Sequence, residues 1–144
     1  MHGGKNVKFK QFQFLKNEAI KKLTALEQEP LRLRKRTIEE CLSADAVMLA
    51  YIGDAVYSMY VRERVVQMNI SKVQVLHTIV TEFICAKSQA KVLLEIEDTF
   101  TEQEQAIARR ARNSNVNVPK SSSVQEYRSS TAFEAVLGFL YETR

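Results

Sequence analysis

The sequence predicts an all-helical protein. Its 144 residues include only 4 Gly and 2 Pro, so the residues that interrupt helices are scarce. Apolar residues recur at helical spacing over long stretches, and no stretch alternates apolar and polar residues as a strand does. No apolar run approaches the ~20 residues that cross a bilayer, and lysines break up the N-terminal apolar residues where a signal peptide would need them together. We therefore expect a helical protein of the cytoplasm, without a membrane segment.

The first half of the chain is divided by its charges, by Pro30 and by capping residues. Residues 7–30 (VKFKQFQFLKNEAIKKLTALEQEP) have helical apolar spacing with lysines between, and the basic stretch LRLRKRT connects them to the next helical region. Thr37 with Glu40 has capping-box spacing, and Ser43 is the expected N-cap of an apolar helix over residues 44–67. We divide the chain into a basic N-terminal helical extension, 1–38, and a domain over 39–144.

The second half should contain three further helical regions. Ser71 with Gln74 begins a stretch long enough for two helices with a bend between them, and Thr101 with Glu104 has the same capping-box spacing. Residues 113–129 are rich in Asn and Ser and predict a long loop. A last helix, STAFEAVLGFLYE, runs nearly to the end of the chain.

The net charge of +4 hides an uneven distribution. Residues 1–38 carry ten Lys/Arg and three acids, residues 39–104 carry five and eleven, and residues 105–144 carry six and three. Basic ends around an acidic middle suit a protein that grips a polyanion and holds carboxylates at its centre. Solvated helix faces explain the same charges equally well.

Two acids stand out within apolar helices. LAYIGDAVYSMYV, residues 49–61, is apolar on every side, which predicts a buried helix, yet it carries Asp54 beside Gly53. A buried aspartate needs a cation from elsewhere in the fold or a metal, and a helical glycine indicates close approach of another backbone. Glu134 is the second acid, with Gly138 one turn on. The alternative for Glu134 is a capping box with Thr131, and the alternative for Asp54 is an arginine partner.

Other catalytic arrangements find little support. Cys41 and Cys85 belong to no C-x-x-C or Cys/His pattern, so we expect two buried free thiols in a reducing cytosol. His77 lies on an amphipathic helix and is expected to be a core or boundary residue. The absence of E-x-x-H disfavours a di-metal carboxylate bundle, and no phosphate-binding glycine loop occurs.

Three segments in order resemble the ribonuclease III family. LAYIGDAVYSMYVR resembles its signature segment, ICAKSQAKVL resembles the stretch with Asn-Lys-x-x-Ala, and TAFEAVLGFLY resembles its second acidic motif. Two acids of the family's motifs are replaced here, by Ala50 and Thr131. These two replacements, and the lack of a double-stranded-RNA-binding domain after the motifs, make the chain resemble the short branch of the family, Mini-ribonuclease III. The segment ARRARNSN also resembles the Arg-x-Arg-Asn segment of that branch. It stops where a further helix usually comes in that branch, so an incomplete C-terminal end is expected.

The resemblance implies a ribonuclease III-like helical fold, a homodimer, and a metal-dependent endoribonuclease that cuts double-stranded RNA. It implies that Asp54 and Glu134 are catalytic and bind Mg²⁺, with Mn²⁺ able to substitute, and that Lys87 lies near the scissile phosphate. No organic cofactor is implied. The expected RNA contacts are Lys87, Arg109, Arg110, Arg112 and Lys120, and the implied substrate is the precursor of large-subunit (23S) ribosomal RNA. In the family, the signature helix packs against its dyad mate.

Two alternatives to a nuclease remain open from the sequence. A non-catalytic RNA-binding or dimerisation module of the same fold would bind RNA without metal and without cutting. A purely structural helical protein would tolerate Asp54→Asn or be stabilised by it.

Overall fold

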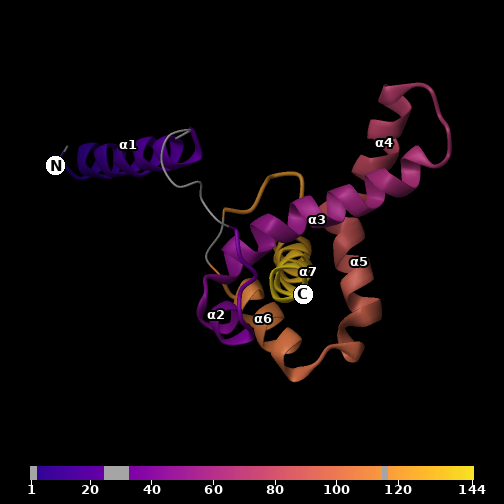
Figure 1. The fold of residues 1–144 in the computed structure, drawn as a ribbon. Helices are drawn as coiled ribbons and strands as arrows, with labels where there is room; N and C mark the ends of the chain where they lie inside the picture. Colours follow the sequence, from indigo (N-terminus) through magenta and orange to yellow (C-terminus); the bar gives the residue numbers. More distant parts are fainter. Residues whose placement is uncertain (1–2, 25–32, 115–116) are drawn as a thin grey trace. The chain divides into compact units, whose positions relative to one another are not determined.

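The computed structural model describes residues 3–24, 33–114 and 117–144. The chain divides into two compact units, Met1–Arg34 and Lys35–Arg144. The first unit contains α1, Gly3–Thr24, which lies within the predicted basic extension (Figure 1). The predicted helix end at Pro30 lies outside the described residues, as do the first two residues of the basic connector.

The second unit is built from six α-helices and one short 3₁₀ turn in its described residues. These are α2 (Ile38–Ser43), α3 (Ala46–Val66), α4 (Val73–Ile84), α5 (Ala86–Ile96), the turn η1 (Glu97–Thr99), α6 (Glu102–Arg112) and α7 (Val124–Thr143). The described residues contain no strand, so the all-helical fold class is confirmed.

The helix boundaries follow the capping residues only in part. The side chains of Thr37 and Thr101 cap α2 and α6, as predicted, and the bend between α4 and α5 falls at Cys85. Ser43 is not the cap of α3, because it belongs to the last turn of α2 and donates to the carbonyls of Glu39 and Glu40. The cap is Asp45, whose carboxylate accepts from the N–H of Val47.

Two other predicted starts were wrong. Helix α4 follows Lys72 and has no side-chain cap, so the Ser71–Gln74 pair is not a capping box. Helix α7 begins at Val124, because the Ser123 hydroxyl accepts from the N–H of Glu126. The predicted loop over 113–129 is correspondingly shorter.

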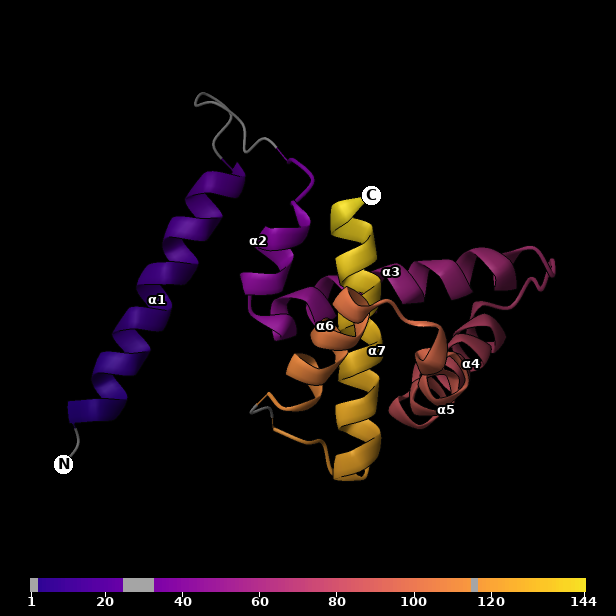
Figure 2. The same cartoon turned by 90° about the horizontal axis from the view of Figure 1, so that it is seen from below.

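Helix α7 is the centre of the second unit. Figures 1 and 2 show it end-on and from the side, with α2, α3, α5 and α6 arranged around it. Its sequence is apolar on most sides because each side meets a different helix. The core that it forms with these helices consists of Ala132, Phe133, Ala135, Val136 and Phe139 with Cys41, Ala46, Leu49, Ala50, Leu93, Ile107, Ala108 and Ala111.

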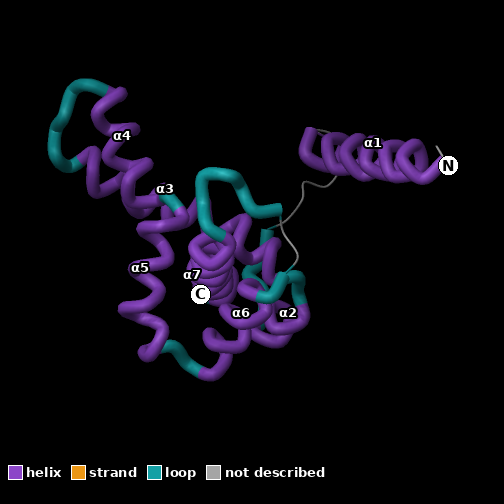
Figure 3. The backbone as a smooth tube through the Cα atoms, turned by 180° about the vertical axis from the view of Figure 1, so that it is seen from behind, coloured by secondary structure: helices purple, strands orange, loops and turns teal. Residues whose placement is uncertain are grey.

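A second, smaller core joins the end of α3 to α4. Val61 and Val65 pack against Val80 there, and Figure 3 shows this helical hairpin extending away from α7. Asn69, in the loop of the hairpin, has φ of 57°, a left-handed conformation that asparagine tolerates better than most residues. The hairpin thus depends on few buried side chains.

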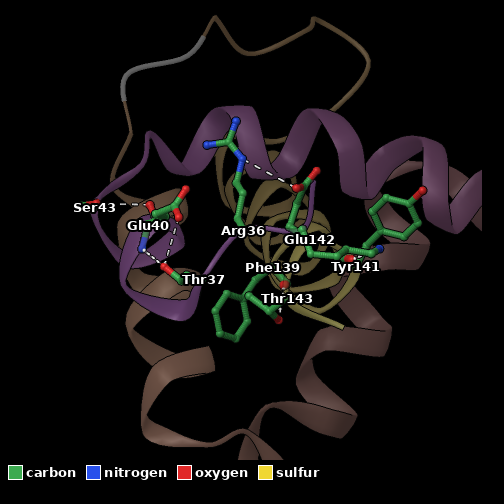
Figure 4. A network of polar contacts seen from close by, with 9 residues as sticks. Arg36, Thr37, Glu40, Ser43, Phe139, Tyr141, Glu142 and Thr143 are labelled. Atoms are coloured by element: carbon green, nitrogen blue, oxygen red, sulfur yellow. Dashed lines mark hydrogen bonds and ion pairs between the residues drawn. The ribbon is translucent and has the colours of Figure 1, made fainter. Parts of the chain in front are cut away.

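The segment before α2 is attached to the end of α7. The N–H of Arg36 donates to the carbonyl of Glu142 at 2.8 Å, and its Nε lies 3.6 Å from the Glu142 carboxylate (Figure 4). Lys35 Nζ donates to the carbonyl of Tyr141 at 2.8 Å and lies 4.2 Å from the centroid of its ring. These contacts fix the C-terminal turns of α7 against the start of the unit.

Helix α3 is not buried on every side in the single chain, contrary to the prediction. Its inner face carries Leu49, Ala50, Gly53, Val61 and Val65. Its outer face exposes a stripe, named here the α3 stripe, of Met48, Tyr51, Ala55 and Met59, and Tyr51 is 84% exposed. No helix of the described residues is long and apolar enough to span a membrane.

Candidate active site

The helices α3 and α7 cross in backbone contact at two glycines. A Cβ at Gly53 would overlap the carbonyl oxygen of Glu134, and a Cβ at Gly138 would overlap the carbonyl oxygen of Leu49. Each glycine therefore lies against the backbone of the other helix. The prediction that Gly53 permits close approach of a backbone is confirmed, but that backbone is α7 of the same chain and not the dyad mate.

The crossing brings Asp54 and Glu134 together from positions 80 residues apart in the sequence. Asp54 directly follows the glycine that contacts Glu134, and its charge acts on the Glu134 carboxyl. Tyr57, one turn further along α3, packs edge-on against Phe133 with ring centroids 5.0 Å apart. The glycine contacts and this ring pair fix the two acids relative to each other.

The two acids have different environments. Asp54 is exposed, so the expectation of a buried aspartate was wrong. Glu134 is half-buried, and desolvation, followed by repulsion from Asp54, raises its pKa from 4.5 to about 8. A pKa raised in this way shows that the site, without a cation, disfavours the ionised form of Glu134.

Neither carboxylate forms an ion pair or a hydrogen bond with the described residues. The arginine partner proposed for Asp54 is therefore not found among them. The capping box proposed for Glu134 was also wrong, because Thr131 lies in the second turn of α7 and its hydroxyl donates to the carbonyl of Tyr127 at 2.9 Å.

This pair of acids fits a small divalent cation. Two carboxylates held together without a counter-ion lose their mutual repulsion when a cation binds between them. No group of three or more His, Cys, Asp or Glu side chains converges in the described residues, so the chain offers two protein ligands here. Mg²⁺ is commonly bound by one or two carboxylates, with water and phosphate oxygens completing its octahedron.

Ala50 and Thr131 lie at the crossing but add no ligand. Both side chains are buried, Ala50 in the core below α3 and Thr131 on α7. The positions where the family's motifs carry acids are therefore filled here by small side chains that support packing.

The structure places the predicted RNA-contacting residues on several elements. Lys87 is exposed in the first turn of α5, a helix that packs against α7. Arg109 is exposed on α6 and lines a pocket of about 240 Å³ together with Arg112, Glu97 and Asp98. Lys120 is exposed in the loop before α7.

Two of the three arginines of α6 have partners within the protein. The guanidinium of Arg110 donates to the carbonyls of Leu42 and Ala44, which ties α6 to the turn between α2 and α3. Arg112 lies 3.3 Å from the Glu97 carboxylate in an exposed ion pair. Of the three, Arg109 therefore has the guanidinium most available to a ligand.

The sequence analysis did not identify one buried polar residue, Gln89, and predicted wrongly that Cys85 is buried. Gln89 on α5 is 1% exposed, and neither its Nε2 nor its Oε1 finds a partner in the described residues. Its spacing alone would assign it to the core face, four residues before Leu93, so the sequence held a signal. Cys41 is buried as expected, but Cys85 is exposed; both are free thiols.

The comparisons with known proteins agree with this geometry. The ribonuclease III domain family matches residues 47–144, the part that contains both acids and excludes α1. A Mini-ribonuclease 3 of Thermoanaerobacter sp. (strain X514) is 44% identical over 73% of this chain and 75% of its own length. A Mini-ribonuclease 3 of Staphylococcus aureus is 45% identical over 65% of this chain and 72% of its own length.

A solved structure is also similar. A crystallised protein of Fusobacterium nucleatum superposes with a TM-score of 0.66 and 31% identity, over 69% of this chain and 81% of that protein. The family match and the sequence relatives together show that the chain belongs to the ribonuclease III family, in its Mini-ribonuclease 3 branch, and is an endoribonuclease.

Proposed function

We propose that this chain is a Mg²⁺-dependent endoribonuclease that cuts double-stranded RNA. Its catalytic residues in this proposal are Asp54 and Glu134. The observation that carries the proposal is the pair of acids at the crossing of α3 and α7, which find no counter-ion among the described residues. The family acts on double-stranded RNA and depends in general on divalent metal. The choice of Mg²⁺, with Mn²⁺ able to substitute, is our proposal.

The two acids have distinct tasks in this proposal. Bound Mg²⁺ supplies an acidified water and stabilises negative charge on the phosphodiester. Asp54 is exposed, so an arriving cation would meet its carboxylate first. Glu134 would hold the cation as a carboxylate, because a cation beside it would offset both its burial and the charge of Asp54.

The basic residues would hold the RNA backbone. Lys87, Arg109 and Lys120 are exposed on α5, α6 and the loop before α7, and we propose that they contact phosphates. Arg112 can contribute if its ion pair with Glu97 opens, whereas Arg110 contributes chiefly by fixing α6. A-form RNA is recognised largely by its shape and its phosphates, so lysine and arginine side chains suffice.

We propose that two copies of the chain associate through the α3 stripe. Met48, Tyr51, Ala55 and Met59 follow one another at intervals of three or four residues, so they form one apolar line on the helix. An exposed apolar line of this kind marks an interaction surface. A twofold contact of one α3 with another would cover it and give one active site on each protomer.

The substrate in the cell is proposed to be the precursor of 23S ribosomal RNA, the substrate class that the Mini-ribonuclease III branch implies. We further propose that residues 39–144 are the catalytic domain and residues 1–38 an added basic extension. The family match to residues 47–144 supports this division.

Cleavage of a long, perfectly paired RNA tests the proposed function. Wild-type protein should cut both strands with Mg²⁺ and neither strand with EDTA, whereas Asp54→Asn and Glu134→Gln should bind the RNA and leave it whole. Glu63→Gln, at an exposed acid on the same α3, is the matched control and should cut normally. Cutting by either site variant at the wild-type rate would contradict the assignment.

Mapping the cut ends separates the proposed substrate from duplex RNA in general. Precursor 23S RNA, incubated with the protein, should be cut at the paired stem that joins its ends. Equal cutting throughout unrelated duplexes of the same length would contradict the ribosomal assignment without affecting the metal site.

A further inference from the structure

Helix α1 carries a surface that the ribonuclease III match leaves unexplained, since that match starts at residue 47. The helix contains six lysines and one acid, Glu18, in 22 residues. Its large apolar side chains lack a packing partner within the described part of their unit: Phe9 is 62% exposed and Phe12 is 61% exposed. A helix with such exposed apolar side chains gains little stability from tertiary packing. Binding of a partner would therefore stabilise it.

The lysines point to a polyanion. Lys8, Lys10, Lys16 and Lys22 make no ion pair with the described residues, and only Lys21 pairs with Glu18, at 3.4 Å. Lys10 and Lys21 lie on the side of α1 opposite to Phe12 and Lys16, so positive charge is found around the helix and is not confined to one face. The protein already acts on a polyanion, RNA.

One side of α1 interleaves rings with lysines. Phe9 is three residues from Phe12, and Lys8 and Lys16 are each four residues from it, so all three side chains are neighbours of Phe12. We name these four residues the α1 platform. Exposed rings one turn apart, flanked by lysines, provide stacking surfaces for bases and cations for the phosphates between them.

The mixture of rings and lysines on α1 disfavours two other ligands, a membrane surface and the groove of a partner protein. A helix that lies in a membrane surface needs one continuous apolar face, and a helix bound in a groove presents apolar anchors at i, i+3 and i+7. Phe12, Leu15 and Ala19 do have this spacing, but Lys16 lies on the same side of α1, so a charge interrupts the apolar anchors. Phe9, Phe12 and Leu23 lie on one side of α1, but Lys8 and Lys16 lie on that same side, so the face is not continuously apolar.

We propose that the α1 platform binds unpaired nucleotides of RNA, with bases stacked on Phe9 and Phe12 and phosphates contacted by Lys8 and Lys16. Bases within a duplex are already stacked on each other, so the rings select single-stranded segments beside the duplex that is cut. The inference rests on the proposed function only in taking RNA as the substrate. It makes the N-terminal extension a tether that recognises the flank of the cleavage site.

The test is the binding of a 12-nucleotide oligouridine to the full chain in EDTA, measured by fluorescence anisotropy. Phe9→Leu with Phe12→Leu removes the rings, keeps apolar side chains and raises helix propensity, so α1 should still form. We expect this pair to weaken oligouridine binding about tenfold or more. The matched control is Phe14→Leu, on the opposite side of α1, which should bind as wild type does.

Charge and cleavage complete the test. Lys8→Gln with Lys16→Gln should lower the slope of log affinity against log salt concentration for oligouridine by about 1.4, which is ~0.7 for each lysine. Cutting of a blunt duplex should be unchanged in the Phe9/Phe12 variant, so failure of the tether and failure of the nuclease are distinguishable.

Three results would overturn the inference: no oligouridine binding by wild-type protein at low salt, equal affinities in wild type and the Phe9/Phe12 variant, or an equal loss with Phe14→Leu. Vesicles of anionic phospholipid distinguish a membrane ligand. If the Phe9/Phe12 variant binds oligouridine like wild type but loses a vesicle binding that wild type shows, the α1 platform belongs to a membrane surface.

Discussion

At the scale of single residues, the site depends on what surrounds each charge. Glu134 lies close to Asp54 and has no counter-ion in the described structure, so in the folded protein without metal its burial, followed by repulsion from Asp54, disfavours its ionised form. Arg110 shows the opposite case, because its charge is used inside the fold on two carbonyls. Charged residues therefore contribute to stability in one place and to function in another.

The first prediction concerns pH and Glu134 in metal-free protein. The folded pKa is about 8 and the ordinary value is 4.5, so between these pH values the folded state holds a proton that the unfolded state has lost. Stability should therefore fall as pH rises through this window and level off above it. Glu134→Gln should raise the free energy of unfolding at pH 8.5 by about 2 kcal/mol. This is less than the free energy equivalent to the whole pKa shift, because water reaches the carboxyl and weakens the effect.

Thermal melts of wild type and Glu134→Gln in EDTA, from pH 4 to 9, measure this effect. Asp54→Asn should weaken the pH dependence of stability only in part. It removes the repulsion from Asp54 but leaves the burial of Glu134, which is the larger cause of its raised pKa. Parallel pH profiles for wild type and Glu134→Gln would contradict the prediction.

The second prediction separates two neighbouring arginines. Arg110→Ala leaves the carbonyls of Leu42 and Ala44 without their donor and should destabilise the protein by about 1.5–3 kcal/mol. Arg109→Ala removes an exposed side chain and should leave stability within about 0.5 kcal/mol while weakening duplex RNA binding. Chemical denaturation and RNA titration of both variants measure the contrast, and a larger loss of stability in Arg109→Ala would disprove it.

At the scale of elements, the crossing of α3 and α7 is what makes a site from two helices. Helical spacing and glycine placement indicated that a backbone approaches Gly53, and the position of Glu134 near Gly138 indicated a second such helix. The partner of Gly53 could not be deduced from the residues, because a glycine signals close approach without naming what approaches. Identifying it required the fold.

The third prediction concerns the glycines at the crossing. Gly53→Ala should gain about 1 kcal/mol from helix propensity and lose more than that from the overlap with the Glu134 carbonyl. We expect a net loss of about 3 kcal/mol or more, or failure to fold, as for other overpacked cores. Gly138→Ala should behave in the same way, whereas Ala55→Ser, on the exposed α3 stripe, should be close to neutral. Chemical denaturation ranks the three, and a stabilised Gly53→Ala would contradict the described crossing.

The fourth prediction concerns the α3 stripe. Tyr51→Glu places a charge at the centre of the proposed twofold contact and should convert dimers to monomers at micromolar concentration. Met68→Glu changes another exposed apolar residue outside the stripe and should leave the dimer intact. Sedimentation velocity on the two variants distinguishes them. Dissociation by Met68→Glu and not by Tyr51→Glu would move the interface to the α3–α4 loop.

At the scale of the whole molecule, the fold class and the candidate acids could be predicted from the sequence, and several local features could not. Low Gly and Pro content and helical spacing are properties of the whole chain, so they survive local errors. The cap at Ser43 was misassigned because a serine in the last turn of one helix and a serine before the next look alike in sequence. The cap at Ser71 was placed one residue early, because α4 follows Lys72. The extent of burial on α3 was overestimated because the exposed apolar residues of the α3 stripe follow the same helical spacing as buried ones.

The central claim is that Asp54 and Glu134 hold one divalent cation together. Mn²⁺ binding to the full chain at pH 8, measured by the electron paramagnetic resonance of free Mn²⁺, tests this claim without RNA and without cleavage. Asp54→Asn and Glu134→Gln should each abolish the same tight site, their combination should lose nothing further, and Glu63→Gln should keep it. Unchanged Mn²⁺ binding in both single variants would contradict the claim and place the metal elsewhere.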